Sequence, residues 1–498
     1  MRGRIPAPGE YIVSTLSTRA TQQRLKVNSI GPWGLAALAI GITSPAMGLY
    51  ALWGPMQLAA GPITPLIFLA SMLLTLPTAI SYALLNYRSP SAGSASTWLW
   101  QCLHPTAGLL AGYLMTTYFL MAAVAQPLMF ALFFRDFLTW LHISIPDMTT
   151  MILGILLSTV PIAWTCLRGA ESSIKATVRL MLIETLVVVC LSVTIVAYGA
   201  PGSATLAPLD PHNATHGLSG FWTAMILGIL AYCGFDVVST AAEEAHAPRE
   251  YVPKAILFTI IGITIFWALN AWAFTISTPP KQVEVYTGQG LTAVTPIAEH
   301  YWGWGSLIVI LTAFTGLTAV YISSVQGTSR IVFALSRHGL LPSKLAHLAG
   351  EKRVPRNAVF GVLLAVVVLD VVTVALLKSG LEGFTWWANA LVFFATLTFL
   401  AVNVANFLYF FRFLRDEFSV PLNFVVPLLG VALNAYLIYA AFFSVLWSSD
   451  LLSDRSVVWA CLVLFSGQVA VVLWIRLRRP ELLAREAPIT VPTSTHGA

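Results

Sequence analysis

The sequence predicts an all-α integral membrane protein with twelve transmembrane helices. Of its 498 residues, 57% are hydrophobic and only 10% are charged, and the mean hydropathy is +0.79. Soluble domains carry about 25% charged residues. A helix needs about 20 mainly apolar residues to cross about 30 Å of hydrocarbon. Twelve stretches meet this requirement, beginning near residues 30, 60, 106, 149, 178, 219, 254, 305, 357, 385, 421 and 456.

Two of these spans are interrupted by residues that break a membrane helix. The first span contains Gly41-Ile42-Thr43-Ser44-Pro45-Ala46, and the sixth contains Gly234 followed by Asp236. A break frees backbone N–H and C=O groups that a substrate or ion can satisfy. Paired breaks in corresponding positions of two halves therefore predict the binding site of a secondary transporter.

The distribution of positive charge predicts the orientation in the membrane. An even number of spans places both termini on one side. If that side is the cytoplasm, all but four of the 27 Lys and Arg residues are cytoplasmic, the four being Arg135, Lys281, Lys378 and Arg455. The positive-inside rule then predicts a multi-pass plasma-membrane protein with cytoplasmic termini. The basic residues around 330–356 are explained by this topology and by anionic lipid headgroups, so no nucleic-acid partner is expected.

The chain is organised as one membrane domain. We expect cytoplasmic tails at 1–29 and 479–498, a transport core of ten helices at 30–411, and two further helices at 412–478. Apolar and basic positions alternate at helical spacing over 328–347, which predicts an interfacial helix. The five scattered cysteines lack CxxC spacing and predict neither a disulfide framework nor a metal site.

Three motifs stand at the cytoplasmic ends of predicted spans. The first comprises Glu243-Glu244, Ala247-Pro248-Arg249, Val252-Pro253 and Ala255-Ile256. The others run from Tyr82-Ala83 to Pro90-Ser91-Ala92-Gly93 and from Ser329-Arg330 to Gly339-Leu340-Leu341-Pro342. Together they resemble the signatures of the amino acid-polyamine-organocation (APC) superfamily of permeases. The resemblance implies a LeuT-like fold, with spans one to five and six to ten forming a 5+5 inverted repeat, followed by two extra helices, and a substrate bound at the breaks of helices 1 and 6.

The chain departs from that superfamily pattern at three places. The first break is Ser44-Pro45-Ala46 where many members have a glycine-rich stretch, and Pro45 removes one N–H donor. His338 replaces a frequent acidic residue, and Ser94 replaces a frequent glycine. These departures affect how a substrate carboxylate binds and how the inner gate closes.

The resemblance also suggests the parts of a substrate pocket. The N–H groups of the first break, at the start of a half-helix, would hold the substrate carboxylate. Carbonyls of the second break would accept from the amino group, Tyr232 and Phe235 would cap the side chain or simply pack, and Gln126 is a weaker candidate at membrane depth. The candidate substrate-binding residues are Gly41, Thr43, Ser44, Ala46, Gln126, Tyr232, Cys233, Gly234 and Phe235.

Glu184 is one of three ionisable residues within the spans, where a charge costs about 2.5 to 3.5 kcal/mol. Arg179 is a poor partner for Glu184, because it lies about 7.5 Å away along the helix and on another face. The resemblance places Glu184 where some proton-coupled members carry an ionisable residue, with Ser323 and Ser324 as neighbours. Proton coupling, sodium coordination and a permanently neutral carboxyl all remain open for Glu184.

Asp236 and Asp370 are the other two ionisable residues within spans. Asp236 suits the N-cap of the second half-helix. Alternatively, it closes an inner gate or binds the amine of a substrate. Asp370 has no partner nearby in the sequence, and we expect it at a helix–helix or oligomer contact.

No motif of an enzyme is present. The sequence lacks HExxH, GxSxG and Walker patterns, and none of its nine histidines lies near the middle of a span. The predicted function is secondary active transport of amino acids or related amines by alternating access, with proton symport preferred over sodium. An amino acid or polyamine exchanger and a non-transporting nutrient sensor are the alternatives. No cofactor, metal or obligatory protein partner is predicted, and the oligomeric state is open.

Overall fold

The computed structural model describes residues 28–168, 170–199, 205–288, 292–350, 353–444, 446 and 452–483. Most of both predicted tails therefore lies outside the described residues. The described chain is almost entirely helical, with two isolated backbone bridges, Ile30 with Ala245 and Ala349 with Val354. Twelve helical stretches in it are long and apolar enough to cross a membrane, which confirms the predicted fold class.

The first five spans form one repeat. Its helices are α2 (Pro32–Thr43), α3 (Met47–Tyr50), α4 (Trp53–Ala60), α5 (Thr64–Arg88), α6 (Ala95–Cys102), α7 (Pro105–Trp140), α8 (Asp147–Leu167) and α9 (Ala170–Tyr198). Helices α2, α3 and α4 together make the broken first span.

The next five spans form the second repeat. Its helices are α10 (Gly217–Tyr232), α11 (Val237–Thr240), α12 (Pro248–Ser277), α13 (Pro280–Gly288), α14 (Val294–Trp302), α15 (Ser306–Arg337), α16 (Arg356–Leu377) and α17 (Gly380–Phe413). Helices α10 and α11 make the broken sixth span. The two added spans are α18 (Val426–Ile438), flanked by π-helical turns η7 (Pro421–Val425) and η8 (Tyr439–Phe443), and α20 (Leu452–Arg478) with the short α21 (Pro480–Leu483).

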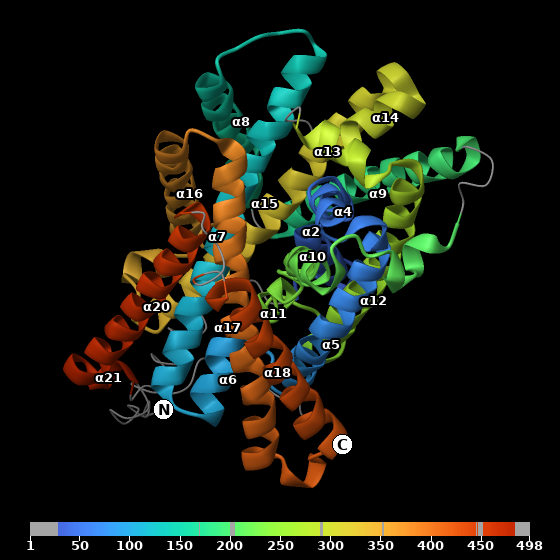
Figure 1. Cartoon of the computed structure of the whole chain (residues 1–498). Helices are drawn as coiled ribbons and strands as arrows, with labels where there is room; N and C mark the ends of the chain where they lie inside the picture. The colour runs from blue at the N-terminus through green and yellow to red at the C-terminus, as the bar shows by residue number, and fades with distance from the viewer. Residues whose placement is uncertain are drawn as a thin grey trace, which may run out of the picture.

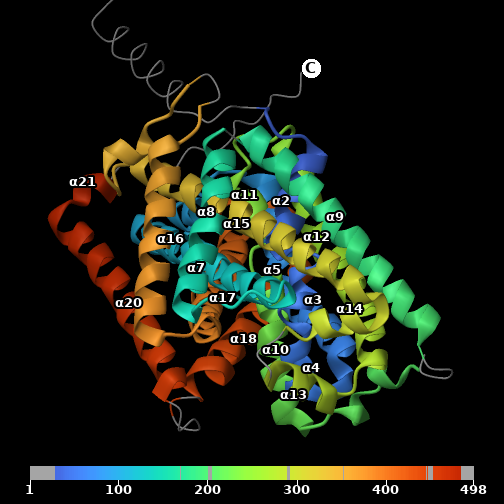
Figure 2. The same ribbon diagram turned by 90° about the horizontal axis from the view of Figure 1, so that it is seen from above.

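Three unbroken helices of the first repeat pack against their counterparts in the second. Helix α5 packs on α12, α7 on α15 and α8 on α16, while α7 also packs on α17 just as α15 packs on α9. The two broken spans run antiparallel at the centre: in Figure 2 the blue chain descends from α2 to α4 beside the green chain that rises from α10 to α11. This exchange of equivalent contacts is the 5+5 inverted repeat.

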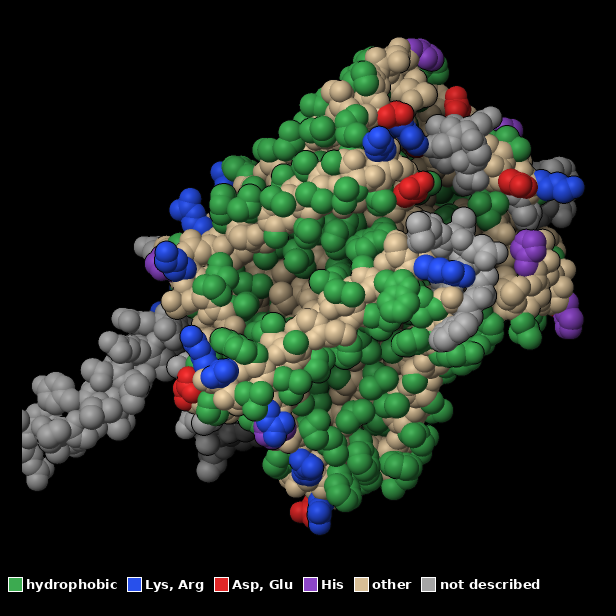
Figure 3. All heavy atoms as spheres, turned by 60° about the vertical axis from the view of Figure 1, so that its left-hand side comes forward, with side chains coloured by type: hydrophobic (Ala, Val, Ile, Leu, Met, Phe, Trp, Pro, Cys, Tyr) green, Lys and Arg blue, Asp and Glu red, His purple; other side chains and the backbone are tan. Residues whose placement is uncertain are grey.

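The added helices lie outside this core. Helix α18 packs on α5 and α17, and α20 packs on α7 and α17 at the edge of the molecule (Figure 1). The outer surfaces are strongly apolar; α9, for example, exposes Leu182, Leu186 and Val193. Figure 3 shows a broad hydrophobic face with charged side chains gathered toward its borders. Such a face is expected where lipid replaces water.

The segment 328–347 differs from its prediction as an interfacial helix. Residues up to Arg337 continue α15, and side chains from Thr328 to Ser336 are buried. Only the short turn η5 (Ser343–Ala346) follows. The helical spacing is real, but the basic positions Arg330 and Arg337 are used for buried ion pairs with the sixth-span exit instead of lipid contact.

Candidate functional site

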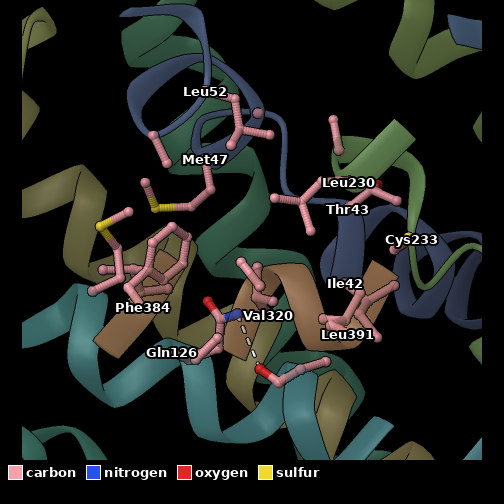
Figure 4. Close-up of a pocket in the computed structure, with 18 residues that line it drawn as sticks. Ile42, Thr43, Met47, Leu52, Gln126, Leu230, Cys233, Val320, Phe384 and Leu391 are labelled. Atoms are coloured by element: carbon pink, nitrogen blue, oxygen red, sulfur yellow. Dashed lines mark hydrogen bonds between the residues drawn. The ribbon is translucent and has the colours of Figure 1, made fainter. Parts of the chain in front are cut away.

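A pocket lies at the level of the two breaks, between both repeats. It comprises about 620 Å³ of space between atoms, part of which is open to solvent. Figure 4 shows Ile42, Thr43 and Met47 of the first span facing Leu230 and Cys233 of the sixth. The remaining walls come from α7, α15 and α17.

The lining of this pocket is almost wholly apolar. Thr43 and Gln126 supply its polar side chains together with the Cys233 thiol, and no charged residue is among the described lining residues. The Gln126 amide nitrogen donates to the Ala122 carbonyl at 3.1 Å, while Thr43 donates to carbonyls of its own helix. Phe384, Leu391, Val320 and other aliphatic side chains form the remainder.

Ser44 organises the first break. It has φ of 42°, a left-handed conformation that is uncommon outside glycine, and Pro45 follows it. The Ser44 hydroxyl donates to Oε2 of Glu184 at 2.7 Å and accepts from the Met47 N–H at 3.2 Å. The Ser-Pro-Ala break is thus held in its conformation by a hydrogen bond to the Glu184 side chain of α9.

The expected carboxylate donors of the first break are engaged within the protein. The Ser44 N–H donates to the Ile40 carbonyl at 2.8 Å, and the Ala46 N–H lies close to the Glu184 carboxyl. Ser44 and Ala46 are fully buried and do not line the pocket, whereas Thr43 does. In this conformation Glu184 therefore occupies donors that the sequence assigned to a substrate.

Glu184 is fully buried between α2, α9 and α15. Its Oε1 has no hydrogen-bond partner among the described residues, and no cation is paired with it there. Gly316 of α15 makes room for it, because a Cβ at that position would overlap Oε2. The carboxyl is thus held by neutral donors alone, which is the arrangement expected of a group that can bind a proton.

Neither Ser323 nor Ser324 makes a hydrogen bond to Glu184 among the described residues. The Ser324 hydroxyl donates to the Val320 carbonyl, within its own helix. The Ser323 hydroxyl faces Gly41, where α2, α9 and α15 approach closely and Thr177 fills the gap. The hydroxyls of Thr177 and Ser323 are buried there, and neither has a hydrogen-bond partner in the described part of the chain.

The second break turns at Gly234, whose φ of 112° suits glycine. Gly234 packs on Ile42 of the first break. Of the residues that the sequence assigned to this side, only Cys233 lines the pocket. Tyr232 instead points toward α5 and α12, where its hydroxyl contacts the Phe68 carbonyl at 3.0 Å and Thr264 at 2.7 Å.

Phe235 and Asp236 also point away from the pocket. Phe235 packs on Tyr82 and Phe399. Asp236 is fully buried and accepts from the Tyr118 hydroxyl at 2.6 Å and from the Tyr82 hydroxyl at 3.0 Å. Its side chain makes no capping hydrogen bond to α11, and it does not line the pocket. The side chain of Asp236 therefore neither caps α11 nor faces the pocket as a partner for a substrate amine, because the Gly234 turn directs its carboxylate toward α5 and α7.

The end of the core that carries the sixth-span exit is closed by paired charges and backbone. Arg330 contacts Glu244 at 2.6 Å, and Arg337 holds Glu243 through two hydrogen bonds of 2.9 and 3.1 Å. These four side chains are nearly buried. The chain before α2 adds a parallel bridge, in which Ile30 pairs with the segment 244–246.

Several site residues carry no local signal in the sequence. Met47, Met129, Leu317, Phe384 and Leu391 line the pocket, yet similar apolar residues elsewhere face lipid or the core. Tyr82 and Tyr118 could be assigned to Asp236 only once α5 and α7 are placed beside the second break. A buried acidic residue such as Asp236 indicates that hydrogen-bond donors must lie nearby, but it does not indicate which helices supply them.

Comparison with known proteins decides the family. A model described as "Amino acid permease" matches residues 30–466, most of the chain. The chain belongs to the amino acid permease family. It is thereby a multi-pass transport protein of the APC superfamily, as the sequence motifs indicated.

Curated relatives of this permease include bacterial and plant transporters. A branched-chain amino acid permease, BcaP, of Bacillus subtilis (strain 168) is 26% identical over 360 residues, covering 69% of this chain and 74% of the relative. BcaP of Lactococcus lactis subsp. cremoris (strain MG1363) is 23% identical over 352 residues, covering 67% and 73%. A methylthioribose transporter of Bacillus subtilis (strain 168) is 22% identical over 442 residues, covering 86% and 91%.

Proposed function

We propose that this permease is a secondary active transporter of neutral amino acids with apolar side chains, working by alternating access in symport with protons. The observation that carries the substrate class is the central pocket, whose described lining contains no charged side chain. A cationic or acidic substrate side chain would lose its hydration there without gaining a partner. An aliphatic or aromatic side chain would instead gain contact with Met47, Phe384 and Leu391.

Two of the relatives are named for branched-chain amino acids and support the same class, whereas others are named for cationic amino acids. The methylthioribose transporter has a different named substrate at similar identity, so the family alone does not define the pocket. The apolar lining of this chain favours a branched-chain or similar amino acid over a sugar-like substrate, because few polar side chains are available to bind hydroxyl groups.

Proton coupling is supported by the contacts of Glu184. The carboxylate accepts from the Ser44 hydroxyl and lies close to the Ala46 N–H, and both donors lie beside pocket residues Thr43 and Met47. A proton on Glu184 weakens its hold on these donors, and they become available to the carboxylate of a substrate. Binding of the proton then increases the affinity for the substrate, and binding of the substrate increases the affinity for the proton. This is the linkage that symport requires.

Alternating access is supported by the closed end of the core. The ion pairs of Glu243 and Glu244 with α15, and the Ile30 bridge, join parts of both repeats at one end of the pocket. The positive-inside rule assigns this end to the cytoplasm, with both termini. Opening it would require these pairs to separate while the opposite end closes.

The test is uptake by purified protein in liposomes. Labelled leucine, isoleucine, valine, phenylalanine, lysine, glutamate, putrescine and choline are compared, with and without an inward proton gradient and with or without internal substrate. We expect gradient-driven accumulation of the apolar amino acids only. Glu184→Gln should abolish the effect of the gradient, while the exposed Glu250→Gln is the matched control.

Each other outcome has a defined meaning. Flux only into preloaded liposomes would replace symport with exchange. Accumulation that needs sodium, or that survives in Glu184→Gln, would remove Glu184 as the proton site. Preferred uptake of lysine or putrescine would contradict the substrate class read from the pocket.

A further inference from the structure

Asp370 is a second buried carboxyl, and it lies outside the central pocket. It belongs to α16, is 0% exposed, and neither carboxyl oxygen has a hydrogen-bond partner in the described part of the chain. Because the side chain is fully enclosed by this single chain, the alternative that it makes an oligomer contact does not fit. A buried polar group of this kind requires an explanation.

The surroundings of Asp370 are apolar. One helical turn before it, Val366 belongs to a core cluster distinct from the main one, formed by α7, α8, α15 and α16. Tyr321 of α15 is in this cluster and lies near Asp370 without a hydrogen bond to it. The Tyr321 hydroxyl lies 3.4 Å from the Thr159 hydroxyl of α8. Tyr321 is therefore a polar side chain that α15 brings near the carboxyl, and Thr159 is in turn close to Tyr321.

The charged groups on the helices packed around α16 are engaged elsewhere or distant. On α16 itself, Arg356 and Lys378 are about 21 and 12 Å away along the helix axis. On α15, both arginines are paired with glutamates of the closed end. Helices α7, α8 and α17 and the turn η5 also pack around α16. Their charged or titratable groups are each exposed, at a helix end or bonded elsewhere. These groups are Tyr113, Tyr118, Arg135, Asp136, Asp147, Cys166, Arg168, Lys344, Glu382, Tyr409 and Arg412.

An ionised Asp370 would therefore be a buried, uncompensated charge. Burial of a carboxylate without a partner is strongly unfavourable, so a cation must neutralise it. A metal cation such as sodium needs several oxygens to replace its hydration shell. Besides its own carboxyl, the site offers two hydroxyls that are already within reach of each other. A proton needs only one carboxylate oxygen.

We infer that Asp370 is a second proton-binding site of the transport cycle, formed with Tyr321 across the interface of α15 and α16. A proton adds to one carboxylate oxygen to give the neutral acid present in this conformation. It returns to water when the helices separate, and no other bond is made or broken. This inference rests on the proposed proton symport.

Helix α15 connects this site to Glu184. Gly316 faces Glu184, and Tyr321 follows five residues later, about 7.5 Å along the helix and about 140° around it. One helix thus forms a wall of both carboxyl sites. A displacement of α15 between the two states of the transporter changes the surroundings of both acids together.

The experiment measures protons moved per substrate, from the substrate gradient that just balances an imposed proton gradient in liposomes, for wild type and Asp370→Asn. Asparagine has the shape of the neutral acid. We expect Asp370→Asn to retain uptake but to move about half as many protons per substrate, since one of two carboxyls is lost. The exposed Asp147→Asn is the matched control and should equal wild type.

Infrared spectroscopy supplies a readout that does not depend on flux. We expect a protonated-carboxyl band that disappears in Asp370→Asn and shifts in Tyr321→Phe, with both variants still folded. An unchanged proton ratio in Asp370→Asn would overturn the inference and leave the proposed function standing. Wild type without any proton-driven uptake would instead refute the proposed symport, and loss of a sodium requirement in Asp370→Asn would identify sodium as the ion and overturn the proton.

Discussion

Gly316 has no side chain, and this leaves space for the carboxyl of Glu184. Helix α15 approaches α2 and α9 closely at this residue, and the carboxyl of Glu184 fills the space that a Cβ would take. The same position lies 3.0 Å from the Ser44 hydroxyl and 3.1 Å from Met47. Gly316 is therefore required by the contact between the proton site and the first break, not by a backbone turn.

Gly316→Ala should disrupt that contact. The added methyl group displaces Glu184 or Ser44, with a destabilisation of about 1 to 3 kcal/mol for overpacking. We expect a lower midpoint of thermal unfolding and loss of proton-driven uptake. Gly262→Ala is the control, because nothing lies within 4 Å of its Cβ position. Equal behaviour of the two variants would contradict the close contact at Gly316.

Substitution of Asp236 should reduce the uptake of all substrates alike. Its carboxylate is held by Tyr82 and Tyr118 and is absent from the pocket lining, so Asp236→Asn weakens two hydrogen bonds to a charged group, about 1.5 to 3 kcal/mol each. We expect uptake of every transported amino acid to fall by a similar factor. Tyr118→Phe should reproduce part of the loss. A selective loss of cationic substrates would instead restore the substrate-amine role.

At the scale of elements, α18 is attached to the core by a buried network of amides and hydroxyls. Asn403 of α17 and Asn434 of α18 both donate to the Thr78 hydroxyl of α5, at 2.9 and 3.1 Å. Asn403 also accepts from Ser81 at 2.8 Å, and Asn423 donates to Asn406 at 3.2 Å. Side-chain hydrogen bonds between membrane helices act as such links where apolar packing alone is weakly directional.

Thr78→Val should loosen this attachment. Valine keeps the shape but leaves two amide groups without their shared acceptor, at a cost of about 1 to 3 kcal/mol. We expect a lower unfolding midpoint in detergent, measured against Thr116→Val. The Thr116 hydroxyl bonds only within its own helix, so that control should change little. An unchanged midpoint in Thr78→Val would show that the network is not stabilising.

The elements of this protein were easier to predict than their side-chain partners. Gly41 to Ala46 and Gly234 interrupt apolar spans, and such interruptions are visible locally, so both breaks were predicted. Glu184 was singled out by its charge alone. By contrast, Phe384 and Leu391 line the pocket with the same residue types that elsewhere face lipid, and periodicity does not distinguish the two.

For the whole molecule, the closed end joins the first span, the sixth span and α15 at one place. Glu243 and Glu244 come from the chain after α11, while their arginines come from α15. The motifs that indicated the superfamily contain Glu243, Glu244 and Arg330, but the sequence did not predict that these glutamates pair with Arg330 and Arg337, since helical spacing suggested an interfacial helix. Both partners of each pair belong to the second repeat, so the pairing depends on how its sixth and eighth spans are placed and not on any one segment.

Reversing the charge of Arg337 should open the closed end of the core. Arg337→Glu removes a buried pair, for which a loss of about 3 to 5 kcal/mol is usual, and adds repulsion. With the other four cysteines replaced, Cys233 in the pocket should react more than about tenfold faster with a membrane-impermeant thiol reagent from this side, since 1.4 kcal/mol corresponds to tenfold. Adding Glu243→Arg should restore slow labelling.

The control is Arg88→Glu. Its ion pair with Glu417 is partly exposed, and such surface pairs contribute little. Labelling of Cys233 should therefore stay slow in this variant. Fast labelling in both single variants, or in neither, would argue against the Glu243 pair as a determinant of closure.

The bridge between Ile30 and Ala245 makes part of this closure independent of side-chain identity. Ser29 and Ile30 donate their N–H groups to the Glu244 carbonyl, and the His246 N–H donates to the Ile30 carbonyl. Every amino acid except proline carries these groups. Substitutions on the neighbouring side chains can therefore adjust how long the transporter dwells in this state, while the register in which its two broken spans meet is preserved by the main chain itself.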